Sequence, residues 1–173
     1  TKNETLHQTM QEWANILGLS GAPFDSYLTL RGLRTLQLRM KAHEKTALAL
    51  AEVIAEHPLV VKVNYPGLSS DPNHSLAKKQ QLGFGGMLSF EIKGGLQEVE
   101  KFFKHIECFS LAESLGGFES LVCHPYTMTH APLSSEDKKK AGISENLIRI
   151  SVGIEEEEDL IKSLLKALEK TRK

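Results

Sequence analysis

The sequence predicts an α/β or α+β fold, in which a small sheet is covered by helices on one side. Strand-like and helical patterns alternate through the chain, and this alternation is typical of a sheet layered with helices. The 173 residues are 40% hydrophobic, which is enough to bury a core of ordinary size. The last strand-like stretch, NLIRISVG, runs directly into a helical pattern that opens with acidic residues.

Two helical patterns precede the first strand. The stretch ETLHQTMQEWANILGL has apolar residues at helical spacing, and glycines that end a helix follow. Asp25 is expected to cap a second, long helix over residues 26–57, which Pro58 ends. Gly32 weakens this helix and predicts a bend or a close approach of another backbone. Apolar residues on more than one face of the long helix indicate a surface that packs against another part of the protein or another chain. They are Leu28, Leu30, Leu33, Leu36, Leu38 and Met40.

Strands and helices alternate in the rest of the chain. The expected elements are strands over 59–66, 85–92 and 146–153, and helices over 73–83, 94–106 and from Glu155 onward. One face of the strand over 85–92 and one stripe of the helix over 94–106 are apolar: Leu88, Phe90 and Ile92 on the strand, and Leu96, Val99, Phe103 and Ile106 on the helix. After a short strand near Phe109, residues 112–144 are expected to be irregular.

Composition excludes several classes of partner. The formal net charge is -1 and basic residues are dispersed, so no nucleic-acid surface is expected. No apolar run approaches the roughly 18 residues of a membrane span, and residues 1–20 do not resemble a signal peptide. Cys108 and Cys123 lie far apart, as expected of free thiols in a reducing compartment. The chain is therefore expected to be cytoplasmic.

Arg149 lies in the middle of the last expected strand. Leu147 and Ser151 share its face, while Ile148 and Ile150 point to the other. A guanidinium on a rigid strand is well suited to bidentate binding of a planar carboxylate. That carboxylate belongs either to a ligand or to this domain itself, and the spacing leaves both possibilities open.

Residues 112–131 are predicted to form a long loop, and loops of this length are usually functional or disordered. The segment is too rich in apolar and aromatic residues for disorder. Ser114 precedes Gly116 and Gly117, so its hydroxyl and the neighbouring amides could line a turn that a carboxylate approaches. A simple strand-ending turn is the alternative. Glu113 is either a partner for a substrate ammonium or a solvated acid.

Two further patterns predict no functional site. Cys123, His124 and His130 match no four-ligand zinc spacing, and no base for a nucleophilic Cys123 is identifiable. Both histidines are therefore expected to be hydrogen-bonded loop residues. The glycines of the GFGG stretch, residues 83–86, do not open a helix after a strand. They predict turns that lead into a strand, with no phosphate-binding loop.

Three long motifs together resemble one enzyme family: FDSYLTLRGLRTLQLRM, AESLGGFESLVCHPYTMTHA and AGISENLIRISVGIEEEEDLI. They are similar to the C-terminal part of the trans-sulfuration enzymes, the pyridoxal-phosphate (PLP) enzymes of cysteine and methionine metabolism. The closest likeness within the family is to the bacterial cystathionine γ-synthases. The resemblance implies the small domain of the fold-type I PLP enzymes, with a mainly antiparallel sheet. It divides the chain into connecting helices over 1–56 and this domain over 57–173.

The resemblance also implies roles for three residues. Arg149 corresponds to the arginine that binds the substrate α-carboxylate, and Ser114 to the serine that assists it. Glu113 corresponds to a glutamate associated with γ-type substrates. The implied reaction is γ-replacement, in which an activated homoserine ester and cysteine give cystathionine. The γ-lyases, β-lyases and homoserine-ester sulfhydrylases of the family remain alternatives.

The chain lacks part of the family's pattern. No Ser-x-Thr-Lys motif for the PLP lysine occurs, and the family's other cofactor-binding residues belong to a part that precedes Thr1. PLP is therefore expected to bind to that absent part, and this chain alone is expected to be inactive. The expected partners are amino-acid substrates and further copies of the chain, since the family is usually tetrameric. A non-catalytic, standalone fragment is the alternative from another class.

Overall fold

The computed structural model describes residues 1–19 and 21–172. The chain divides into two compact units, Thr1–Gln37 and Leu38–Lys173. The expected assignment of residues 1–56 to connecting helices and of 57–173 to a small domain stays a prediction. Helix α3 (Leu36–Ala55) lies mostly in the second unit and contributes buried residues to its core.

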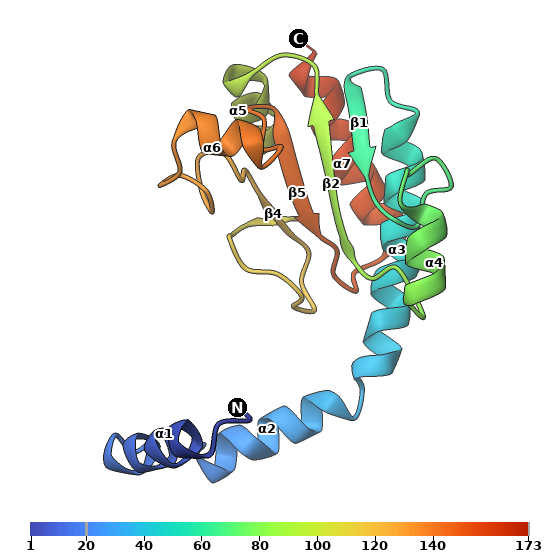
Figure 1. Ribbon diagram of the computed structural model, residues 1–173. Helices are drawn as coiled ribbons and strands as arrows, with labels where there is room; N and C mark the ends of the chain where they lie inside the picture. Colours follow the sequence, from blue (N-terminus) through green and yellow to red (C-terminus); the bar gives the residue numbers. More distant parts are fainter. Residues whose placement is uncertain (20, 173) are drawn as a thin grey trace. The chain divides into compact units, whose positions relative to one another are not determined.

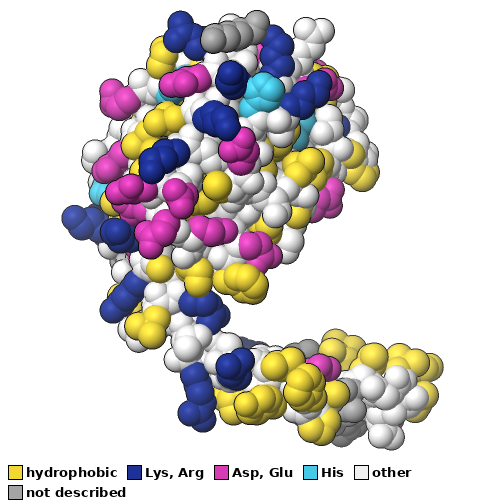
Figure 2. Space-filling model, turned by 180° about the vertical axis from the view of Figure 1, so that it is seen from behind, with side chains coloured by type: hydrophobic (Ala, Val, Ile, Leu, Met, Phe, Trp, Pro, Cys, Tyr) yellow, Lys and Arg dark blue, Asp and Glu magenta, His cyan; other side chains and the backbone are white. Residues whose placement is uncertain are grey.

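The first unit consists of two helices with no buried residue, α1 (Glu4–Ile16) and α2 (Pro23–Leu33). Helix α2 begins two residues before Asp25, with Ala22 at the cap position, so the prediction that Asp25 is the cap was wrong. Pro23 starts the helix because its fixed φ suits the first turn. Figure 2 shows apolar side chains exposed along this unit. They include Leu6, Met10, Trp13, Ile16, Phe24, Tyr27, Leu28, Leu30 and Leu33.

The long helix expected over residues 26–57 is two helices. Helix α2 ends at Leu33 and α3 begins at Leu36, so a turn at Arg34 and Thr35 separates them. Helix α2 ends one residue after Gly32, where a bend was predicted. Glycine is a poor helix former, which favours a break at this point.

Five strands form one sheet in the second unit, in the order β1-β2-β5-β4-β3. All neighbours pair antiparallel except β3 and β4, which are parallel. The strands are β1 (Val60–Asn64), β2 (Met87–Ile92), β3 (Ser110–Leu111), β4 (Leu121–Cys123) and β5 (Leu147–Ser151). The predicted mixed fold with a small, mainly antiparallel sheet is confirmed. Strand β4 was missed inside the expected loop, because three consecutive buried residues show no alternation.

Helices α3, α5 (Leu96–His105) and α7 (Glu157–Thr171) cover one face of the sheet (Figure 1). The shared core contains Leu50, Ile54, Leu88, Phe90, Ile92, Phe102, Ile148, Ile150, Leu160, Leu164 and Leu168. The expected stripe on α5 was partly wrong. Val99 and Phe102 are buried, whereas Leu96 is 38% exposed and Phe103 only half-buried. Phe102 and Phe103 are adjacent, so the sequence does not reveal which of them faces the core. In the structure α5 packs against α7, and Phe102 is the buried one.

Two short helices complete the unit, α4 (His74–Gln80) and α6 (Ser135–Lys140). Helix α6 lies in the stretch expected to be irregular, and the Ser134 hydroxyl accepts a hydrogen bond from the Asp137 amide at its start. Within the described part of the chain, no helix is both long and apolar enough to cross a membrane.

Candidate functional site

Arg149 is the central residue of β5, on the sheet face opposite the three covering helices. Its strand neighbours Ile148 and Ile150 are fully buried in the core, so the period of two turns Arg149 away from them. Its register partners are Ser89 on β2 and Cys123 on β4. The prediction that Arg149 and the isoleucines occupy opposite faces is confirmed.

The hydrogen-bond partners of Arg149 are backbone carbonyls. Its Nη2 donates to the Glu113 oxygen at 2.7 Å and to the Ser114 oxygen at 3.3 Å. Among the described residues Arg149 forms no ion pair. The alternative of a carboxylate from this domain is therefore wrong for the described residues. A guanidinium has five N–H donors, and these two contacts use only one nitrogen. The other donors remain for a planar anion.

The structure brings Glu113 and Ser114 to Arg149 through their backbones. Both residues are exposed, in the turn that links β3 to β4. The turn passes through Gly116, whose φ of 74° favours glycine. The Gly116 amide donates to the Ser151 hydroxyl at 2.8 Å. Ser151 lies two residues after Arg149 on β5, on the same face of the strand. The backbones of Glu113 and Ser114 therefore lie against the guanidinium, and the roles of their side chains stay predictions.

Charges at this site act on Cys123. Burial raises the pKa of the Cys123 thiol, Arg149 lowers it and Glu113 raises it, burial having the largest effect. The thiol is thus buried and protonated, which is unsuitable for a nucleophile.

A small apolar cavity of about 260 Å³ lies behind the turn at Leu115 and Gly116. Its other lining residues are Met40, His43, Phe84, Gly85, Gly86, Met87, Ser151 and Val152. The GFGG stretch leads directly into β2, and the Tyr65 hydroxyl donates to the Gly85 carbonyl at 2.9 Å. The stretch leads into the strand as predicted, but as irregular backbone without a hydrogen-bonded turn. Burial raises the pKa of Tyr65, which keeps this hydroxyl protonated as a donor.

His124 and His130 do not come together at a metal site. The described residues contain no group of three or more His, Cys, Asp and Glu side chains that could hold a metal ion. His124 Nε2 lies 2.9 Å from the Glu145 carbonyl and Nδ1 lies 2.8 Å from the Thr127 hydroxyl. His130 Nδ1 lies 2.8 Å from the Thr129 hydroxyl. The prediction of hydrogen-bonded loop histidines is confirmed.

Comparison with known proteins identifies the family. Residues 1–169 match the family model described as Cys/Met metabolism PLP-dependent enzyme. The chain belongs to this family. It is 46% identical over 170 residues to a cystathionine gamma-lyase of Dictyostelium discoideum, covering 98% of this chain and 44% of the relative. It is 48% identical over 166 residues to a cystathionine beta-lyase of Coxiella burnetii, covering 96% and 43%.

A solved structure of a family member confirms the fold. The cystathionine gamma synthase of Xanthomonas oryzae pv. oryzae, crystallised in complex with aminoacrylate and cysteine, superposes with a TM-score of 0.89 and 49% sequence identity. The match covers 99% of this chain and 44% of that protein. The chain spans less than half the length of the relatives it matches.

Residues of the described chain do not fit a complete PLP site. The cofactor needs a lysine at its reactive atom, and the buried lysine among the described residues, Lys138, is committed elsewhere. Its Nζ lies 4.3 Å from the centre of the Tyr126 ring and donates to the Ala131 carbonyl at 3.4 Å.

Proposed function

We propose that this chain is the substrate-binding C-terminal part of a PLP enzyme that makes cystathionine from an activated homoserine ester and cysteine. The proposal rests on Arg149, a rigidly placed guanidinium that has only backbone partners among the described residues. The similarity to a cystathionine gamma synthase over 99% of the chain supports the choice of reaction. PLP, when bound to the longer enzyme, would stabilise the carbanions of γ-replacement.

Arg149 binds the substrate α-carboxylate through the donors that the loop carbonyls leave free. Glu113 O and Ser114 O orient the guanidinium, so the arginine is held before substrate arrives. The Ser114 hydroxyl donates to the same carboxylate. The Glu113 carboxylate attracts the substrate ammonium and distinguishes γ-type substrates. Positioning of this kind lowers the entropic cost of reaching the transition state.

The cofactor and the proton-transferring lysine are supplied from outside this chain. On its own the chain therefore neither binds PLP productively nor turns over substrate. We further propose that the longer enzyme is cytoplasmic and homotetrameric. The apolar side chains exposed on α1 and α2 support an assembly, because they need a covering surface. A non-catalytic, standalone fragment is the rival proposal, and activity in the longer enzyme separates the two.

The test is Arg149→Ala in the longer enzyme. Hydrogen bonds to charged groups contribute about 1.5–3 kcal/mol, so we expect KM for the homoserine ester to rise about 10- to 100-fold. PLP absorbance should be unchanged. Ser89→Ala is the matched control, because Ser89 is the register partner of Arg149 on β2, and its KM should stay near wild type. Loss of the PLP spectrum with an unchanged KM would contradict the assignment.

A second candidate activity is cleavage of cystathionine. The relatives named as gamma-lyase and beta-lyase share 46% and 48% identity with this chain, as much as the synthase does. Supplying O-succinylhomoserine with cysteine, and separately cystathionine, distinguishes these activities by product. Accumulation of cystathionine supports the synthase, whereas release of cysteine or homocysteine from cystathionine supports a lyase. Replacing cysteine by sulfide tests a homoserine-ester sulfhydrylase.

A further inference from the structure

We propose that residues 151–155, the SVGIE segment, form a clamp that positions the carboxylate-binding loop, residues 113–120. This inference rests on the proposed function and deepens it. Backbone or side-chain groups from four of the five clamp residues bind the turn or its C-terminal end. They are Ser151, Gly153, Ile154 and Glu155, which follow Arg149 on the same strand and its exit.

The first contact of the clamp lies directly after the site. Ser151 Oγ accepts the Gly116 amide at 2.8 Å, and Ser151 is buried, with 2% of its surface exposed. Gly116 lies two residues after Ser114, in the left-handed backbone region at a φ of 74°. The hydroxyl therefore fixes the loop at a residue with left-handed backbone, two positions after Ser114.

The second contact lies at the end of the loop. The Glu155 carboxylate accepts the Ser120 amide at 2.7 Å and the Ser120 hydroxyl at 2.8 Å. The Ser120 hydroxyl in turn accepts the Gly153 amide at 2.8 Å. The Ile154 amide donates to the Phe118 carbonyl at 2.9 Å. Four hydrogen bonds thus tie the exit of β5 to the residues that close the loop.

Gly153 allows this close approach. A Cβ at this position would lie 2.5 Å from both the Phe118 oxygen and the Ser120 nitrogen, which are backbone atoms that cannot move independently. The φ of Gly153 is not in the left-handed region, so the glycine is required for space alone. A backbone must pass this close for the four hydrogen bonds to form.

The loop residues that precede the first contact, Glu113, Ser114 and Leu115, are exposed. Arg149 contacts this part of the loop through the backbone carbonyls of Glu113 and Ser114. The clamp fixes the loop at Gly116 and Ser120, so it also fixes the two carbonyls that orient the guanidinium. Ser151 and Glu155 are therefore positioning residues, which act on substrate through Arg149 and Ser114.

The experiment compares Ser151→Ala with the conservative Ser151→Thr in the longer enzyme. Loss of one buried hydrogen bond should raise KM for the homoserine ester about 3- to 10-fold, with kcat nearly unchanged. Threonine keeps the acceptor, and the added methyl has room because Ser151 lines the cavity beside the turn. Ser151→Thr should therefore restore the wild-type KM. In an Arg149→Ala background the Ser151→Ala change should raise KM by a smaller factor, because the part of its effect that acts through Arg149 is already lost.

Amide exchange gives a readout that does not depend on activity. The Gly116 amide should exchange faster in Ser151→Ala than in wild type. Glu155→Gln is a second variant at an exposed position, and it should speed exchange at Ser120 without unfolding the domain. Wild-type exchange at Gly116, or faster exchange with an unchanged KM, would overturn the clamp. Failure of the proposed function is separate, since Arg149→Ala alone would then leave KM unchanged while Gly116 exchange still responded to Ser151→Ala.

Discussion

The two faces of the central sheet differ in what they bind. On the covered face, Phe90 and Ile148 pack against three helices and are fully buried. On the open face, the adjacent residues Ser89 and Arg149 lie opposite each other in register and carry polar groups. A single strand such as β5 therefore packs into the core with Ile148 and Ile150 and carries the proposed binding residue, Arg149, on its other face.

Neighbouring residues of one strand therefore need not have related effects. A substitution of Ile148 or Ile150 is expected to act on folding, whereas one at Arg149 is expected to act on the proposed ligand. The same division suits the proposed carboxylate site, since the core on the far side holds the strand rigid.

The largest effect on stability is expected from Phe90→Ala. Phe90 is fully buried and meets Phe102 edge-on, with ring centres 5.9 Å apart. Removal of a buried phenylalanine costs about 3–5 kcal/mol of unfolding free energy. Ser89→Ala, one residue away on the open face, should cost less than about 1 kcal/mol, since its hydroxyl accepts one bond from the partly exposed Asn64. Urea unfolding of both variants measures the difference. Equal losses would show that the two faces are not independent.

The sequence predicted the covered face better than the open one. Alternation of Leu88, Phe90 and Ile92 identified β2, and Arg149 was singled out because a charge interrupts an apolar strand. Strand β4 was missed, because a central strand buried on both faces has no polar alternation. The helix of residues 26–57 was overextended, because helical periodicity alone does not reveal a two-residue turn.

The candidate site was predicted only in part. The predicted roles of Arg149, Ser114 and Glu113 follow from the resemblance. The contacts between Arg149 and the backbone carbonyls of the other two residues are seen only in the structure. Ser151 was noted for sharing a face with Arg149, but its bond to Gly116 joins residues 35 positions apart. Contacts between a strand and a distant turn depend on tertiary packing, and no local pattern in the sequence encodes them.

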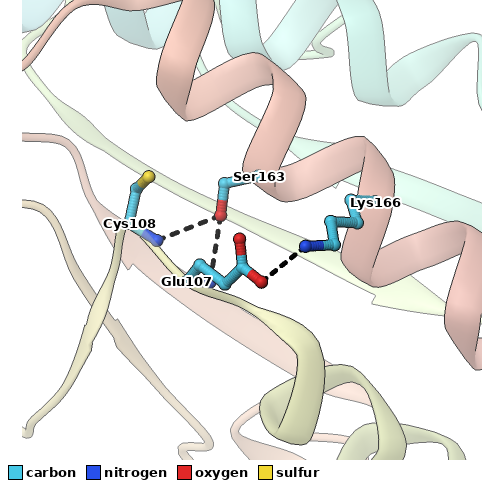
Figure 3. Close-up of polar contacts among 4 residues, drawn as sticks. All are labelled: Glu107, Cys108, Ser163 and Lys166. Atoms are coloured by element: carbon cyan, nitrogen blue, oxygen red, sulfur yellow. Dashed lines mark hydrogen bonds and ion pairs between the residues drawn. The ribbon is translucent and has the colours of Figure 1, made fainter.

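A smaller loss of stability is expected from Ser163→Ala. Ser163 lies on α7, is buried, and accepts the amides of Glu107 at 3.0 Å and Cys108 at 3.1 Å (Figure 3). Its loss leaves both amides without this acceptor, which costs about 1–3 kcal/mol. The matched control is Lys166→Ala, which removes an exposed ion pair to Glu107 three residues along the same helix. Exposed pairs contribute little, so this control should unfold at nearly the wild-type temperature. A larger loss of stability in Lys166→Ala than in Ser163→Ala would show that the ion pair contributes more than the Ser163 hydrogen bonds.

The smallest effect is expected from pH at His124, which lies buried just beyond β4. A carbonyl only accepts, so Nε2 carries the proton that is donated to Glu145 O, and Nδ1 accepts from Thr127. Burial lowers the pKa of His124 below its ordinary value of 6.5, with a smaller contribution from Lys138, while the Glu145 carbonyl opposes the shift. The folded state therefore prefers the neutral ring.

The sign of the pH effect follows from this preference. A folded-state pKa below the unfolded one means that stability is fully present above pH 6.5 and declines as the pH falls toward the folded pKa. An NMR titration should give His124 a midpoint below 6.5. Unfolding of wild type and His124→Gln between about pH 7.5 and 5.5 should show a weaker decline in the variant, because it has no titrating ring. His57, whose pKa burial also lowers, accounts for part of the decline that remains. An equal decline in both proteins would mean that the buried end of β4 does not contribute to the acid sensitivity of the fold.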